Sequence, residues 1–470
     1  MEISFIGHAS LLVRSGGVSI LSDPWWRGPC FGAQWWPYPA PQTQLLDGAA
    51  PDYIYISHGH HDHFHPGTLA SLPKTATVLV SSKTDLAAAV RELGFTVISV
   101  EPDEAVTLGH QGLRCRIIPT HGDDTLMALD DGTEVCLNLN DALHSAPQAV
   151  QDDFVAQLHA LYPKLDYVFC GYGVASHFPN CYQIPGKDAV ATAGQRQQHF
   201  NRQWSRLIAG LRPRFGFPFA ADVVFLQDEL FWVNEATHNR ERPTDVFTHE
   251  HPQSRTEVLD IAPGFTIDSG VVSRSLLRRP IDAAALREQL GDEIARANRI
   301  GLASTAMADE VLALLQANLE QCRDHLISFD GDYRIALRFL NSDRCLLLTK
   351  SRRKLSLQLR PAEDVQAPDL TYTTRWAYLR WALQRPFGHE ILFVGSGGIF
   401  DYPSAAAAKR DLHQELIHLI RNKPLPARSA GANKQALVYK LKSLVKALLG
   451  RRQLDLYDLM TWTVFDRQRH

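Results

Sequence analysis

Residues 58–63 read His58-Gly59-His60-His61-Asp62-His63, and they come directly after the apolar run 53–56, Tyr-Ile-Tyr-Ile. Neutral imidazole is the commonest metal ligand in proteins, and a His/Asp cluster of this density has little purely structural reason on a surface loop. The alternative is a solvated polar loop without a ligand. Because the cluster ends a strand-like run, the pattern predicts a metal site at the carboxyl edge of a sheet.

The bulk composition is typical of a soluble globular protein. The 470 residues suffice for two or three domains, and 45% of them are hydrophobic and 21% charged. A formal net charge of -3 gives no bias toward nucleic acid. We see no run near the roughly 18 apolar residues that a spanning helix needs. The N-terminus lacks the pattern of a secretory signal, so we expect a cytoplasmic protein without membrane contact.

The seven cysteines are dispersed, with no C-x-x-C pair among them. An odd, scattered set indicates reduced thiols and excludes a zinc finger. No C-x-H is followed by C-x-x-H, so we expect no Rieske iron–sulfur site within this chain.

Residues 1–278 alternate short strand-like runs with loops and helices. Gly16-Gly17 is typical of a hairpin turn, and helices are expected over 84–93 and 152–161. The pattern favours a layered α/β sandwich. The strand-like runs are residues 3–6, 10–13, 18–21, 53–56, 77–80, 96–100, 113–118, 135–139 and 167–170.

Residues 279–470 read as a separate C-terminal α+β domain with a linker at 423–433. A Gly-rich stretch at 395–398 follows the strand-like run 391–394, and a plain turn is favoured there over a phosphate loop. The basic amphipathic stretch 434–452 is expected to dock on its own domain or on a partner rather than on a membrane. The domain vaguely resembles a lipid-carrier domain. Helices are predicted over 281–297, 304–326, 405–421 and 434–449, and an antiparallel meander over 333–339, 345–348 and 355–359.

The pattern His-x-His-x-Asp-His after a strand resembles the metallo-β-lactamase superfamily. The resemblance implies a four-layer αββα sandwich over residues 1–278 and two metal ions. His58 and His60 would hold one ion, while Asp62 and His63 face the second. We take Asp62 as a catalytic carboxylate as well as a ligand.

The superfamily has three further ligands downstream, and the resemblance implies that His121 and Asp141 supply two of them. Both follow strand-like runs, and Asp141 would bridge the two metals as a second catalytic carboxylate. A surface histidine and a helix N-cap are the respective alternatives. For the last ligand we choose His177, with His144 and His238 as poorer candidates.

His8, in Gly7-His8-Ala9-Ser10, matches the start of a branch of the superfamily that includes the ascorbate-6-phosphate lactonase and a phospholipase D. In that branch this histidine lies near the site, so we expect a supporting role for His8 behind a ligand. Trp25, Trp26, Trp35 and Trp36 are unusual in one loop. They can close over a substrate or pack the edge of the sandwich, and we leave both alternatives open.

A closer resemblance, over most of residues 1–275, is to the CMP-N-acetylneuraminate hydroxylase family. It rests on Asp23-Pro24-Trp25-Trp26-Arg27-Gly28-Pro29-Cys30-Phe31 and on the stretches 173–182, 212–220 and 261–268. Two departures stand out. The chain has no Rieske pattern, and Gln227, followed by Asp228-Glu229, stands where the family is expected to have a histidine. His177 can substitute for that histidine, or Asp228 or Glu229 can contribute an oxygen.

Two activities are compatible with this ligand set, and imidazole and carboxylate suit the metals of both. We favour an iron-dependent oxygenase or hydroxylase of a small metabolite, with dioxygen as cosubstrate and a separate electron-donor protein. The alternative is a hydrolase of an ester, lactone, amide or phosphodiester, with zinc or manganese and metal-bound hydroxide. We expect no nucleic-acid partner, and a homodimer is a further expectation.

Overall fold

The computed structural model describes residues 1–46, 48, 50–120, 124–173, 176–238, 241–273, 282–302, 307–385 and 388–422. Four features named above lie outside these ranges: His121, the domain boundary near residue 279, the linker 423–433 and the basic stretch 434–452. In the described part of the chain, no helix has both the length and the apolar character to cross a membrane. The described residues form two compact units.

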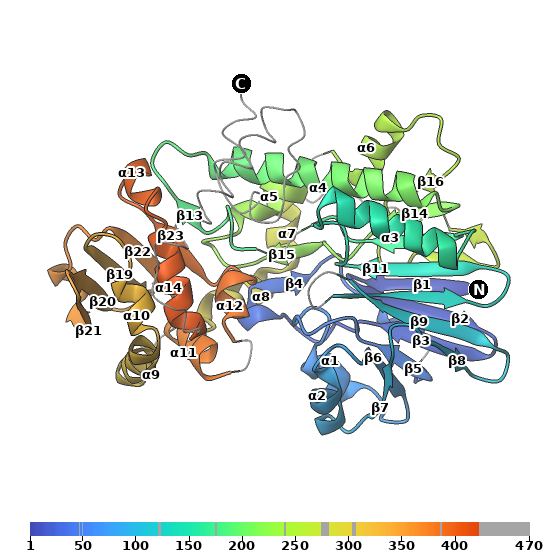
Figure 1. The fold of residues 1–470 in the computed structure, drawn as a ribbon, viewed down its shortest axis with the longest axis horizontal. Helices are drawn as coiled ribbons and strands as arrows, with labels where there is room; N and C mark the ends of the chain where they lie inside the picture. Colours follow the sequence, from blue (N-terminus) through green and yellow to red (C-terminus); the bar gives the residue numbers. More distant parts are fainter. Residues whose placement is uncertain are drawn as a thin grey trace. The chain divides into compact units, whose positions relative to one another are not determined.

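The first unit contains two sheets whose outer faces are covered by helices (Figure 1). The first sheet has the order β18(Val271–Val272), β17(Thr266–Asp268), β1(Glu2–Gly7), β2(Ser10–Ser15), β3(Val18–Ser22), β5(Tyr53–Tyr55), β6(Thr77–Ser81), β7(Thr96–Val100). The second has the order β16(Glu257–Val258), β14(Phe215–Pro218), β12(Tyr167–Cys170), β11(Val135–Asn140), β10(Thr125–Asp130), β9(Leu113–Pro119), β8(Ala105–Leu108). The β2–β3 hairpin turns at Gly16-Gly17, as predicted.

The apolar clusters of this unit show its four layers. One cluster lies between the sheets and joins residues such as Phe5 and Tyr55 to Met127 and Phe169. A second packs the other face of the second sheet against α3(Gln148–Leu161) and α4(Ala189–Leu211). A third packs the first sheet against α1(Pro66–Ser71) and α2(Leu86–Glu92). Strands buried on both faces in this way explain the continuous apolar runs in the sequence. The predicted αββα sandwich is confirmed.

Strand direction brings polar loops to one edge of each sheet. In the first sheet β3, β5, β6 and β7 are parallel neighbours. In the second sheet β11, β12, β14 and β16 are parallel neighbours. The carboxyl ends of parallel strands meet at the same edge, where ligand sites of α/β sheets usually lie. The hexapeptide follows β5 there, and Asp141 follows β11.

The second unit is built on a six-stranded sheet, and the predicted antiparallel meander is its β19–β20–β21 portion. Helices α9, α11 and α14 pack together. The sheet order is β13(Tyr182–Gln183), β23(Gly398–Asp401), β22(Leu370–Thr374), β19(Tyr333–Phe339), β20(Arg344–Ser351), β21(Lys354–Pro361). The helices are α8(Gly291–Arg299), α9(Met307–Gln321), α10(Arg323–Ile327), α11(Trp376–Gln384), α12(Glu390–Phe393), α13(Ala405–Ala408) and α14(Leu412–Arg421).

Four local predictions are wrong, one of them the single helix predicted over 304–326, which is divided into α9 and α10. The run 391–394 is a strand in the prediction but lies in helix α12, because a short apolar run has no periodicity that separates the two forms. The single helix predicted over 281–297 is two helices, α7(Ala283–Gln289) and α8, and the one over 405–421 is also divided, into α13 and α14. The sequence analysis also missed the 23-residue helix α4.

The units divide the chain differently from the predicted boundary at residue 278. In the described part of the chain, the second unit begins at Asp292, and it also takes in the segment Ala175–Thr192. In that segment β13 pairs with β23, and the thiol of Cys181 lies 3.5 Å from the carbonyl of Ser396. Phe178 and Tyr182 are buried. The segment 175–192 therefore packs with residues from the last third of the sequence, including strand β23.

A chain that ends at residue 278 should accordingly be cut by chymotrypsin after Tyr182, whereas the full chain should resist. Limited proteolysis with mass spectrometry measures this. Phe400→Ala in the full chain, which removes a ring stacked at 5.0 Å on Tyr182, should give intermediate cleavage. Val271→Ala, at a 73% exposed position, is the matched control. Equal protection of Tyr182 in the full and shortened chains would contradict the assignment of this segment.

Candidate metal centre

The hexapeptide forms a compact turn between β5 and α1. The amide N–H groups of His63 and Phe64 both donate to the carbonyl of His60, at 3.0 and 2.7 Å. Pro66 then begins α1, and the ring of His65 caps that helix by accepting from the amide of Thr68 at 3.1 Å. Pro at the first helical position and a capping side chain before it are a common helix start. The turn is thus held at both ends.

The second sheet supplies Asp141 through a strained loop. Asn140, the last residue of β11, has a φ of 34°, and its side-chain oxygen accepts from the amide of Asp141 at 2.6 Å. Its side-chain amide donates to the carbonyl of Thr125 at 2.7 Å. Asparagine tolerates this left-handed region better than most residues. Asn140 therefore sets the direction in which Asp141 leaves the strand.

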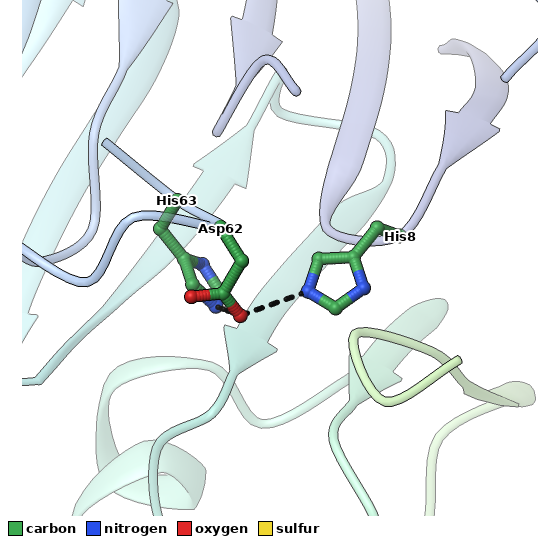
Figure 2. Close-up of side chains that lie close together, drawn as sticks. All are labelled: His8, Asp62 and His63. Atoms are coloured by element: carbon green, nitrogen blue, oxygen red, sulfur yellow. Dashed lines mark hydrogen bonds and ion pairs between the residues drawn. The ribbon is translucent and has the colours of Figure 1, made fainter. Parts of the chain in front are cut away.

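Two groups of possible ligand atoms result, and His63 belongs to both. His8, Asp62 and His63 form one group, and His58, His63 and Asp141 form the other; the ligand atoms in each lie within 4.8 Å of one another. Nε2 of His63 is 3.4 Å from a carboxylate oxygen of Asp62 and 3.4 Å from one of Asp141. Figure 2 shows Asp62 between the rings of His63 and His8. The structure thus brings together His58, Asp62, His63 and Asp141, as predicted from the sequence.

The charges of this cluster suit a cation. Burial opposes a charged imidazole at His63, yet Asp62, Asp141 and Asp23 raise its pKa well above the usual value. Burial would raise the pKa of Asp141, but His63 lowers it to about 2. At His58, burial followed by the neighbouring His63 lowers the pKa well below the usual value, so this ring is neutral. Ionised carboxylates and neutral imidazole are the forms that bind metals, so a bound ion would replace the proton that the three carboxylates favour on His63.

Several buried polar atoms here have no hydrogen-bond partner. They are Oδ1 of Asp62, Nε2 of His63 and Oδ1 of Asp141. An unpaired buried polar atom is costly, and each one in a native structure needs an explanation, such as an ion. These atoms belong to Asp62, His63 and Asp141, which are also members of the two ligand groups. These residues therefore fit a bound metal.

Asp23 and Ser57 support the ligands, and the sequence analysis did not assign either to the site. Asp23 accepts from the hydroxyl of Ser57 at 2.7 Å and from Nδ1 of His63 at 2.9 Å. The Ser57 oxygen lies 3.0 Å from Nδ1 of His58. Because Nδ1 of each ring faces an acceptor, Nε2 of each is directed to the opposite side of the ring, the usual arrangement behind metal-bound histidines. Asp23 follows β3, the parallel neighbour of β5, so strand order is the signal that could have revealed it.

Asp124 is a second acidic group that the sequence analysis missed. Its carboxylate lies 3.7 Å from Nε2 of His58. Burial and then the charge of Asp141 raise the pKa of Asp124. His60 is only half-buried, and its Nδ1 lies 2.8 Å from Nε2 of His58. These contacts place both residues beside the group that contains Asp141.

His177 is placed elsewhere by the structure. It belongs to the second unit, where Nδ1 lies 2.8 Å from the carbonyl of Phe393 and Nε2 lies 3.1 Å from the hydroxyl of Tyr182. Neither group of ligand atoms found among the described residues contains His177. Among the described residues, Asp228 and Glu229 also fall outside both ligand groups, and Gln227 is buried.

The structure shows what His8 and the tryptophans contact, which the sequence did not decide. Nε2 of His8 lies 3.1 Å from a carboxylate oxygen of Asp62, which fits the expected role behind a ligand. Trp25 is fully buried, edge-on to His8 at 5.0 Å between ring centroids. Trp35 and Trp36 lie on β4(Trp35–Pro37), which pairs with β15(Val223–Phe225). These contacts support edge packing for all three, whereas Trp26 is half-buried.

Asp23→Asn should weaken metal binding by about 10- to 100-fold, because an amide is a poorer acceptor for the Nδ1–H of His63. Competition with a fluorescent chelator measures the affinity. Asp52→Asn is a matched control, since Asp52 accepts from Ser19 before β5, at the other end of the same strand pair. Equal affinities for the two variants would exclude Asp23 as a support of the site.

Comparison with known proteins agrees with this geometry. Residues 2–133 match the family model described as "Beta-lactamase superfamily domain". A Rieske 2Fe-2S iron-sulfur protein of Mycolicibacterium smegmatis is 30% identical over 305 residues, which are 60% of this chain and 56% of that protein. The corresponding protein of Mycobacterium tuberculosis is 29% identical over 306 residues, with the same coverage. The match thus spans little more than half the length of these relatives.

Two further likenesses are more limited. The cytidine monophosphate-N-acetylneuraminic acid hydroxylase of Asterias rubens is 38% identical over 73 residues, which are 15% of this chain and 11% of that enzyme. CmlA, a diiron beta-hydroxylase from Streptomyces venezuelae, superposes with a TM-score of 0.37 and 19% identity over 55% of this chain and 52% of its own. We conclude that the chain has the metallo-β-lactamase fold, because the matched residues 2–133 contain strands β1–β10 and the hexapeptide.

Proposed function

We propose that this chain is a dinuclear-metal enzyme, and that it acts as an iron-dependent oxygenase or hydroxylase on a small metabolite. One observation carries the proposal: His63 is shared by two groups of ligand atoms, and orphaned atoms of Asp62, His63 and Asp141 lie among them. One ion would be held by His58, His60 and Asp141, and the other by Asp62, His63 and the same Asp141. A bound pair would supply either hydroxide from water or the redox chemistry of dioxygen.

The relatives support the oxygenase. A CMP-N-acetylneuraminic acid hydroxylase and two Rieske iron–sulfur proteins are among them by name. This sequence has no C-x-H followed by C-x-x-H, so the electrons would come from a separate donor protein. The protein's own residues would hold the ions, keep Nε2 of His58 and His63 toward them, and exclude water from the buried side of the site.

A hydrolase is the second candidate, and the matched family model favours it. That model describes a beta-lactamase superfamily domain, and the same imidazole and carboxylate donors suit zinc or manganese. The substrate would be an ester, lactone, amide or phosphodiester.

His58→Ala should remove bound metal and activity, and Asp141→Ala should lower the stoichiometry from two ions to one or none. Each change removes a ligand from the group formed by His58, His63 and Asp141. Inductively coupled plasma mass spectrometry of the purified variants measures this. His65→Asn is the control in the same loop, because asparagine can keep the cap of α1. Two ions retained in Asp141→Ala would exclude Asp141 as a bridge.

Anaerobically purified protein should contain two irons and consume dioxygen when a chemical reductant is added. An oxygen electrode measures the uptake, and His58→Ala should abolish it. Two zinc ions, no reductant-dependent uptake and turnover of an ester or lactone would instead establish the hydrolase.

A further inference from the structure

Tyr172, Asp222, Arg242 and Asp260 form a polar network at the carboxyl edge of the second sheet. Tyr172 follows β12, Asp222 follows β14 and Asp260 follows β16, while Arg242 immediately precedes α6(Pro243–Glu250). The guanidinium of Arg242 donates to both oxygens of Asp260, at 2.8 and 3.0 Å. It also donates to the Tyr172 hydroxyl at 2.6 Å, and that hydroxyl donates to Asp222 at 2.7 Å.

This network reaches the metal centre through the backbone of Asp222. The carbonyl of Asp222 lies 3.4 Å from Nδ1 of His8, and the amide of Ala220 donates to the carbonyl of His8 at 3.1 Å. Nε2 of the same ring faces Asp62 at 3.1 Å. His8 and Ala220 both have positive φ, 48° and 54°. Non-glycine residues keep such conformations only where the surroundings hold them.

Side chains pack against only part of the His8 ring, so its orientation depends on hydrogen bonds, including the one to the carbonyl of Asp222. The edge of Trp25 lies against the ring. Elsewhere the ring borders a hollow of about 10 Å³, roughly the room of one water, which Asp222, Tyr38 and Ile261 also line. The contacts at its two ring nitrogens, with Asp222 and with Asp62, therefore set the orientation of His8.

We propose that Arg242 is a positioning residue of the metal centre, which acts through Tyr172, Asp222 and His8 on Asp62. The bidentate pair with Asp260 anchors the guanidinium, and the short contacts through Tyr172 hold the loop after β14. His8 then keeps the carboxylate of Asp62 in the position from which it would hold an ion. The inference rests on the proposed function, because it takes Asp62 as a metal ligand.

A double-mutant cycle tests the inference, with Mn²⁺ affinity of the full chain as the readout. Arg242→Ala and the milder Tyr172→Phe, which keeps the ring and removes the hydroxyl, should each weaken binding several-fold to tenfold. In the His8→Ala background neither should have a further effect, since coupled residues are non-additive. Arg410→Ala, which breaks an arginine–aspartate pair with Asp369 in the second unit, should leave the affinity unchanged.

The outcomes separate this inference from the proposed function. A wild-type chain that binds no metal would overturn both. Two bound ions with unchanged affinity in Arg242→Ala and Tyr172→Phe would overturn only the positioning role. If the loss of affinity in Arg242→Ala or Tyr172→Phe adds fully to the loss in His8→Ala, the positioning role is also overturned. Additive losses would mean that the two residues act independently of His8.

Discussion

The hydrogen bond between His63 and Asp23 is the contact on which the metal centre depends. Both side chains are fully buried, and Nδ1 lies 2.9 Å from the carboxylate. A buried carboxylate needs several donors, and Asp23 has three, from His63 and from the amide and hydroxyl of Ser57. With Nδ1 held there, Nε2 of His63 faces Asp62 and Asp141. One pair thus joins the ends of β3 and β5 and gives the shared ligand its direction.

The rest of the site follows from parallel strands in both sheets. Each parallel neighbour ends at the same edge, so short loops carry Asp23 and the hexapeptide together in one sheet, and Asp141 and Tyr172 together in the other. Four non-glycine residues at this edge also have positive φ: His8, Asp23, Asn140 and Ala220. Positive φ at non-glycine residues is often found at functional sites, where surrounding contacts hold it.

Long or patterned features could be predicted from the sequence, and short or unpatterned ones could not. The apolar run before the hexapeptide is a buried strand, and the β19–β20–β21 meander was recognised from its alternation. The run 391–394 was misassigned because four apolar residues fit a strand and a helix equally. Helix α4 was not predicted from the sequence. The segment 175–192 was assigned to the first domain, because nothing in its own sequence shows that its partners come from residues 393–401.

The sequence by itself determined which chemistry is present: histidines and carboxylates at strand ends, close enough along the chain to predict a metal site. Only the tertiary structure decided which of them meet. Asp141 reaches His63 across two sheets, whereas His177, chosen because it lies after the strand-like run 167–170, has its ring nitrogens engaged in the second unit. The physical reason is that ligand type is a local property of a side chain. Convergence depends instead on strand order and on contacts between residues far apart in the sequence, which no local pattern encodes.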